Sequence, residues 1–144
     1  MRELTAVIDI DAPVERVWSV LADFGAYPEW NPFITQITGE LSPGSKLEVR
    51  IQPPGWRGMT LKPTALRVQA NREFAWLGHL LVRGLFDGEH QFHLAPLAAG
   101  RTRFTQHEEF RGILVLLTGA VLEKTLEGFE QMNAALKLRA EQAG

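Results

Sequence analysis

The sequence predicts an α+β fold in which a curved, antiparallel, seven-stranded sheet wraps around one long C-terminal helix. Two patterns carry this prediction. Residues 113–142 place apolar side chains at steps of three and four, the period of an amphipathic helix. Most of the preceding chain reads as short strands separated by Pro- and Gly-containing turns. A helix of about 30 residues spans about 45 Å, so its apolar stripe is buried only if the sheet curves around it.

The first strand and two short helices are predicted before the main run of strands. Leu4–Ile10 alternates between apolar and polar residues, as a half-buried strand does. Pro13–Ala22 carries apolar residues at helical spacing and begins with a proline, which suits a first helical turn. Tyr27–Pro32 contains two prolines four residues apart, which allow only a turn of α- or 3₁₀-helix.

Six further strands are expected before the long helix. Turn signals such as Ser42–Ser45 separate them, and such short connections favour an antiparallel meander. Pro63 interrupts one of these strands and predicts an edge position or a bulge there. The expected strands are Phe33–Thr38, Lys46–Ile51, Met59–Ala70, Glu73–Leu81, Phe86–Ala95 and Arg101–Phe110.

Composition narrows the classes of function. The 144 residues suit a single domain over residues 1–144, with 45% hydrophobic and 22% charged residues. The absence of cysteine excludes disulfides, thiolate metal sites and cysteine nucleophiles. With a net charge of −2 and scattered basic residues, no nucleic-acid partner is expected. Met1–Ala12 does not resemble a signal peptide and no apolar run reaches membrane-spanning length, so a cytoplasmic location without an integral membrane segment is expected.

Two segments resemble a known superfamily. The segment Asp23–Phe33 reads DFGAYPEWNPF and the segment Leu85–His90 reads LFDGEH. Together with the order of elements, they resemble the SRPBCC superfamily of START and Bet v 1-like proteins, in its bacterial polyketide cyclase/dehydrase-like branch. This resemblance implies a helix-grip fold with a deep apolar cavity between the sheet and the C-terminal helix. Because that superfamily includes lipid carriers, receptors, aromatases and cyclases, the resemblance leaves the chemistry open.

A polar cluster is predicted in the last hairpin. If Leu94 lies opposite Phe104, then Phe92 lies opposite Gln106, and His90 lies opposite Glu108, at Cβ separations of about 4.5–5.5 Å. Aromatic residues share the face of these polar groups, so we expect His90, Gln106 and Glu108 on the concave side of the sheet. We interpret them as the polar end of an apolar pocket, although a structural ion pair explains the same pattern.

The remaining walls of the pocket are predicted from residues that share the inward faces of strands and helix. Trp76 is expected to line the cavity or to pack in the core. Gly128 either leaves room for a ligand or allows the close approach of an aromatic ring such as Trp76. Trp56, in a Pro/Gly loop, is the candidate lid, and Trp30 either gates the entrance or anchors its short helix. The full ligand-binding prediction is Trp76, Phe86, His90, Phe92, Phe104, Gln106, Glu108, Phe110, Val121, Thr125, Phe129 and Met132.

Three functions are consistent with these patterns. The first is binding of a small hydrophobic or aromatic, lipid- or polyketide-like molecule without a reaction. The second is an enzyme resembling polyketide cyclases or aromatases, in which His90 or Glu108 moves a proton. The third is an interaction protein that uses the apolar stretch Ile113–Leu117, which is either buried, a homodimer contact or a partner site. No metal or cofactor is expected, because His90 and His93 point to opposite faces of their strand and His107 belongs to the outer face with His93.

Overall fold

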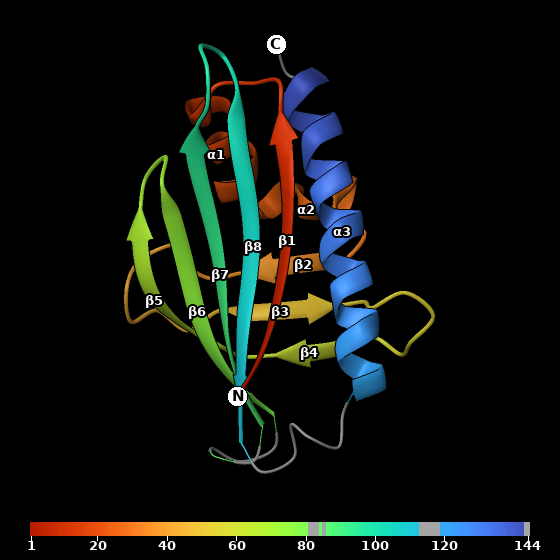
Figure 1. Ribbon diagram of the computed structural model, residues 1–144. Coiled ribbons are helices and arrows are strands. Elements are labelled where there is room, and N and C mark those ends of the chain that lie inside the picture. The colour runs from red at the N-terminus through yellow and green to blue at the C-terminus, as the bar shows by residue number, and fades with distance from the viewer. Residues whose placement is uncertain (81–83, 85, 113–118, 143–144) are drawn as a thin grey trace.

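Eight strands form two antiparallel sheets in the computed structural model, which describes residues 1–80, 84, 86–112 and 119–142 (Figure 1). The larger sheet has the strand order β1-β8-β7-β6-β5 and the smaller one β2-β3-β4. The strands of the larger sheet are β1 (Arg2–Ile10), β5 (Thr64–Gln69), β6 (Glu73–Leu80), β7 (Phe86–Pro96) and β8 (Thr102–Arg111). Those of the smaller sheet are β2 (Ile34–Thr38), β3 (Glu48–Ile51) and β4 (Met59–Leu61).

The predicted count of seven strands in one sheet is therefore wrong. The expected strand Met59–Ala70 is divided at Lys62–Pro63 into β4 and β5, which belong to different sheets. Pro63 has no N–H to donate to a ladder, so the pairing changes where it stands. The two sheets stay linked through an isolated bridge between Lys46 and Thr64. In Figure 1 the strands of the smaller sheet run across those of the larger one.

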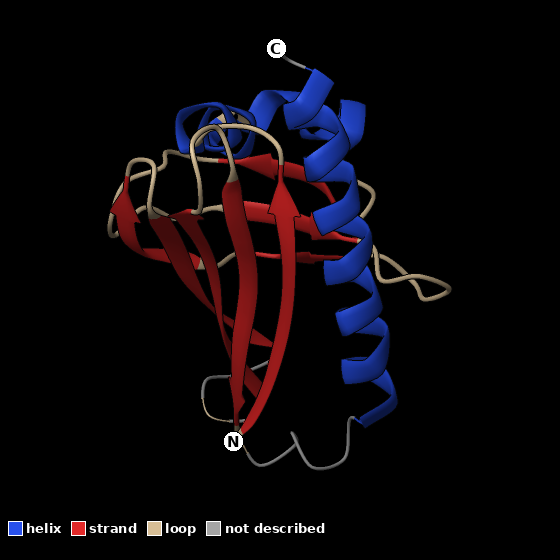
Figure 2. Ribbon diagram, turned by 45° about the horizontal axis from the view of Figure 1, so that its top comes forward, coloured by secondary structure: helices blue, strands red, loops and turns tan. Residues whose placement is uncertain are grey.

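Three short helical segments, rather than the two predicted, follow β1. They are α1 (Val14–Ala22), the 3₁₀ turn η1 (Phe24–Ala26) and α2 (Tyr27–Trp30). The apolar side of α1 buries Val17 and Leu21. The buried Tyr27 hydroxyl donates to the Leu21 carbonyl, and burial followed by the charge of Asp23 raises the pKa of Tyr27. These contacts hold the short helices over one end of the larger sheet (Figures 1 and 2).

The long helix α3 (Gly119–Gln142) packs against β1 and runs alongside it, at the open side of the curved sheet (Figure 2). Its 24 residues correspond to about 36 Å. The predicted start of this helix, including Ile113–Leu117, lies outside the described residues. None of the described helices has the length and hydropathy that a bilayer crossing requires.

Gly128 lies on the buried side of α3 because an aromatic ring occupies the adjacent space. A Cβ at this position would overlap the ring of Phe33. The Phe33 ring is itself held edge-on against Phe129, with ring centroids 5.6 Å apart. Of the two interpretations of Gly128, the structure thus shows the close approach of an aromatic, which is Phe33 and not Trp76.

Polar contacts tie the end of α3 to β1. Lys137 Nζ donates to the Asp9 carbonyl at 3.2 Å, and the backbone N–H of Asp11 donates to Glu141 at 2.8 Å. The Asp9 carboxylate accepts from Arg103 on β8 at 2.9 Å, and this bond lowers the pKa of Asp9. The hydrogen bond from Lys137 likewise lowers the pKa of Glu141.

The concave face of the larger sheet is filled at the end beneath α1. Phe74 stacks on Phe92 with ring centroids 4.4 Å apart, and Phe92 stacks in turn near Phe104. Trp18 from α1 meets Phe74 edge-on at 6.1 Å. All three phenylalanines are fully buried, so this end of the fold is packed core.

Candidate functional site

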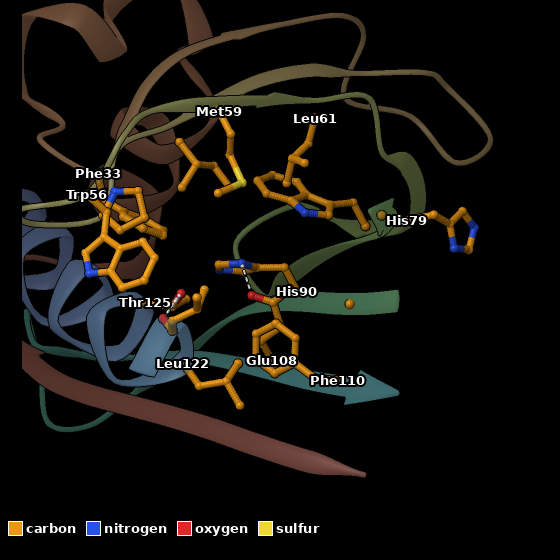
Figure 3. Close-up of a pocket in the computed structure, with 16 residues that line it drawn as sticks. Phe33, Trp56, Met59, Leu61, His79, His90, Glu108, Phe110, Leu122 and Thr125 are labelled. Atoms are coloured by element: carbon orange, nitrogen blue, oxygen red, sulfur yellow. Dashed lines mark hydrogen bonds and ion pairs between the residues drawn. The ribbon is translucent and has the colours of Figure 1, made fainter. Parts of the chain in front are cut away.

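A cavity of about 200 Å³ lies at the other end of the concave face, between both sheets and the first turns of α3 (Figure 3). The larger sheet contributes Trp76, Gly78, His79, Gly88, His90, Glu108 and Phe110. The smaller sheet and its connections contribute Phe33, Ile51, Pro53, Trp56, Met59 and Leu61. The helix contributes Val121, Leu122 and Thr125. This lining is mainly apolar and aromatic, as is usual for binding sites of small molecules.

Two glycines face each other on neighbouring strands at the cavity wall. Gly78 of β6 pairs directly with Gly88 of β7, on the side of the sheet that carries Trp76 and His90. A Cβ at Gly78 would meet only Pro63, at an ordinary contact distance of 3.7 Å. A Cβ at Gly88 would overlap the Glu108 carboxylate. Gly78 thus leaves open space where phenylalanines pack further along the same strands, and Gly88 leaves room for the Glu108 carboxylate.

The predicted pairing of the last hairpin is confirmed. Leu94 lies opposite Phe104, Phe92 opposite Gln106, and His90 opposite Glu108. Nδ1 of His90 lies 3.1 Å from Oε1 of Glu108. The His90 side chain is only 1% exposed, whereas that of Glu108 is 13% exposed, so the carboxylate is the more accessible member of the pair.

Aromatic rings fix the plane of the His90 imidazole. Phe92 stacks on it with centroids 4.4 Å apart and an interplanar angle of 23°. Phe129 from α3 and Trp76 from β6 lie at 4.8 Å and 5.1 Å in tilted arrangements. Because the ring is held on several sides, its two nitrogens point in fixed directions, one toward Glu108 and one deeper into the fold.

Gln106 forms the deeper half of this polar network. Its Nε2 donates to Oδ1 of Asn133 at 2.8 Å and to the backbone carbonyl of Phe129 at 3.3 Å. Its Oε1 lies 3.0 Å from Nε2 of His90. Asn133 is buried on the apolar side of α3 and was not predicted as part of the site. A polar residue within the apolar stripe of the helix is the sequence signal that could have found it.

The cavity includes about half of the residues predicted to bind the ligand. Trp76, His90, Glu108, Phe110, Val121 and Thr125 line it, as does the proposed lid residue Trp56. Five others, although predicted as lining residues, are buried in the core beneath or beside the cavity: Phe92, Phe104, Gln106, Phe129 and Met132. The side chain of Phe86 lies outside the described part of the chain.

Trp30 is also absent from the cavity lining, although an entrance position was one of its two interpretations. Its ring packs edge-on against Tyr27, with centroids 5.1 Å apart, which fits the alternative role of anchoring its short helix. The neighbouring Asn31 acts on the cavity indirectly. Its Oδ1 accepts from the backbone N–H groups of Phe33 and Ile34 at 3.0 Å and 2.9 Å, which fixes the start of β2 and the position of Phe33.

One group among the described residues could reach a common metal ion, and it lies on the convex face of the sheet. It comprises Glu3, His107 and Glu109. The Glu109 carboxylate already accepts hydrogen bonds from Gln91 and Arg111. This group is on the opposite side of the sheet from the cavity, so it has no part in the site described above.

A concave sheet, a long helix closing it and an apolar hollow with one polar pair together define a ligand-pocket protein of the helix-grip class. The sequence matches, over residues 1–141, the family described as polyketide cyclase / dehydrase and lipid transport. The chain belongs to this family, as its resemblance to the polyketide cyclase-like branch of the SRPBCC superfamily predicted. A comparison with curated proteins finds no match to the chain.

Solved structures share the fold. A START superfamily protein from Mycobacterium smegmatis superposes with a TM-score of 0.78 at 21% identity, covering 99% of each chain. The ZhuI aromatase/cyclase from Streptomyces sp. R1128 gives a TM-score of 0.76 at 16% identity, covering 98% of this chain and 94% of the other. At these identities the similarity shows a common fold and does not transfer an activity.

Proposed function

We propose that this protein binds a small, mainly apolar molecule of lipid- or polyketide-like character in the cavity between the sheets and α3. The observation that carries the proposal is the hollow itself, which persists in a fold whose other end is tightly packed. A cavity of about 150 Å³ suffices to hold benzene. The volume of about 200 Å³ found here therefore suits a group of one or two rings, or a comparable stretch of hydrocarbon.

Trp56 marks where such a ligand enters. Its side chain lines the cavity, yet the residue is 41% exposed, so the cavity reaches the surface at the β3–β4 connection. The loop is held locally, because the backbone N–H of Trp56 donates to the Pro53 carbonyl and the backbone carbonyl of Trp56 accepts from the side-chain amide of Gln52. An indole at the opening gives a large apolar contact area and an intrinsic fluorescence signal for binding.

The binding proposal is tested by filling the cavity from Gly78. The variant Gly78→Leu places an apolar side chain in the hollow, whereas Gly25→Leu adds the same side chain at an exposed glycine with open space around it. Native mass spectrometry of protein from the producing cells should show a retained small molecule in the wild type and in Gly25→Leu, and none in Gly78→Leu. Retention that is equal in all three proteins would refute binding in this cavity.

A second candidate function, acid–base catalysis of a cyclase- or dehydratase-like reaction, is favoured by the contact between His90 and Glu108 at the cavity wall. A proton-transfer role requires such a group within hydrogen-bond reach of the substrate. The variants His90→Ala and Glu108→Gln separate the two functions. Both should abolish turnover if the site is catalytic, but only weaken binding if the protein is a carrier.

A further inference from the structure

The hydrogen bonds around His90 determine what the polar end of the cavity presents to a ligand. The backbone carbonyl of Phe129 can only accept, so the Gln106 atom that faces it must be the amide nitrogen. The Gln106 oxygen therefore faces Nε2 of His90. It follows that Nε2 of His90 carries a hydrogen and donates it to Gln106.

The other imidazole nitrogen of His90 faces Glu108. With Nε2 protonated, Nδ1 of His90 has either a lone pair or a second hydrogen. Nδ1 lies 3.1 Å from Oε1 of Glu108, which makes the two groups an ion pair when the imidazole is protonated. Oε1 is therefore the carboxylate oxygen that faces His90.

The second oxygen of the Glu108 carboxylate is a hydrogen-bond acceptor, because an ionised carboxylate only accepts. Oε2 lies against Gly88 at the cavity wall, and no hydrogen bond to it is found within the described part of the chain. Thr125 presents the same chemistry, because its hydroxyl hydrogen is donated to the Val121 carbonyl at 2.8 Å and only lone pairs remain for a ligand.

No lysine or arginine is found among the described residues that line the cavity. Both imidazole nitrogens of His90 have partners, and Nδ1 of the other lining histidine, His79, contacts the Asp87 carboxylate at 2.7 Å. A carboxylate or phosphate buried here would lose its hydration without gaining an ion pair, which is costly.

We propose that the ligand is a neutral molecule that donates a hydrogen bond, through a hydroxyl or N–H group, to Oε2 of Glu108. This inference rests on the proposed function and adds the chemical class of the ligand. Discrimination between ligands then depends on one atom, Oε2 of Glu108. Gly88 positions this atom, because the missing side chain leaves room for the carboxylate.

Three probes of nearly equal size test the inference: 2-naphthol, 2-methylnaphthalene and 2-naphthoate. The measurement is the dissociation constant of each for the full chain at neutral pH by isothermal titration calorimetry. In the wild type, 2-naphthoate should bind most weakly. The quantity that isolates the hydrogen bond is the preference ratio, Kd of 2-methylnaphthalene divided by Kd of 2-naphthol.

Glu108→Ala should lower this preference ratio by about tenfold or more, because a hydrogen bond to a charged group is lost. Glu109→Ala is the matched control, since it removes the same charge from the next residue on the opposite face of β8. Should Glu108→Ala fail to fold, Gly88→Ala supplies the same test by displacing the carboxylate. An unchanged ratio, or tightest binding of 2-naphthoate, would overturn the inference while leaving cavity binding intact. If 2-methylnaphthalene does not bind the wild type, the proposed function fails together with the inference.

Discussion

The facing glycines of β6 and β7 should respond to the same substitution with opposite signs. Neither Gly78 nor Gly88 has a positive φ, so alanine fits the backbone at both positions. Replacing a compatible glycine by alanine stabilises a protein by about 0.4–1 kcal/mol, chiefly by restricting the unfolded chain. Gly78→Ala should show this gain, because its new methyl group would make only an ordinary contact with Pro63, at 3.7 Å.

Gly88→Ala should instead lower the free energy of unfolding. Its Cβ would overlap the Glu108 carboxylate, which can rotate away because it is the end of a flexible side chain. That rotation breaks the 3.1 Å contact with Nδ1 of His90, and a buried polar group left without a partner costs about 1–3 kcal/mol. After the gain from the unfolded chain is subtracted, a net loss of about 1–2 kcal/mol is expected.

Urea unfolding of the wild type and both variants measures these changes directly. The two variants have the same composition, so any difference between them reports the surroundings of the added methyl group. The expected result is a higher unfolding free energy for Gly78→Ala and a lower one for Gly88→Ala. Equal stabilisation of both would refute the placement of the Glu108 carboxylate over Gly88.

Three further predictions concern the helix, the buried network and the outer face. Gly128→Ala gains about 1 kcal/mol of helix propensity, but it forces a methyl group into the buried ring of Phe33 at a cost of about 1–3 kcal/mol. Thermal unfolding should therefore show a lower Tm, and a raised Tm would contradict the close packing of Phe33 on α3. Gln106→Leu leaves the Nε2 hydrogen of His90 unpaired, and urea unfolding should show a loss of about 2–4 kcal/mol, whereas a loss below about 0.5 kcal/mol would argue against the bond. The hydrogen bond from Arg103 lowers the pKa of Asp9 below its ordinary value of 3.8, so this carboxylate stabilises the fold above that pH and the contribution is lost as the pH falls through the lowered pKa. Asp9→Asn should therefore flatten the acid limb of the stability–pH curve. An unchanged acid limb would show that the Asp9–Arg103 pair does not contribute to the loss of stability in acid.

The register of the last hairpin could be predicted from the sequence because two local signals agree. The turn after Pro96 fixes which residues start the pairing, and the alternation of aromatic residues fixes which side faces inward. His90 and Glu108 were placed opposite each other for these reasons, and the structure confirms it. Alternation also predicted that Gln106 points inward.

Alternation does not reveal where along an inward face the hollow begins. Phe92, Phe104, Phe129 and Met132 were predicted as cavity walls, yet they are packed core. Whether an inward-facing residue lines the cavity or packs in the core depends on which elements lie opposite it, and these elements are distant in the sequence. The pair Gly78 and Gly88 carries the missing signal, because glycines at inward positions of adjacent strands leave room, open above Gly78 and occupied by the Glu108 carboxylate above Gly88.

The contribution of the smaller sheet could not be predicted for a related reason. Ile51 and Leu61 reach the cavity because their strands, β3 and β4, run across the larger sheet, and Phe33 directly precedes β2 (Figure 1). The alternation of residues along a strand predicts which side chains face inward, but it does not predict the angle between two sheets. Pro63 predicted an interruption correctly, but only the pairing partners show that the chain changes sheets there.

The most direct measurement of the central claim is crystallography of the protein under xenon pressure, because xenon occupies apolar cavities without needing a specific contact. We expect xenon density between Phe110, Leu122 and Leu61, in the hollow above Gly78, and its loss in Gly78→Leu. An interior in which side chains fill this space, with no xenon bound in the wild type, would show that the fold holds no ligand cavity.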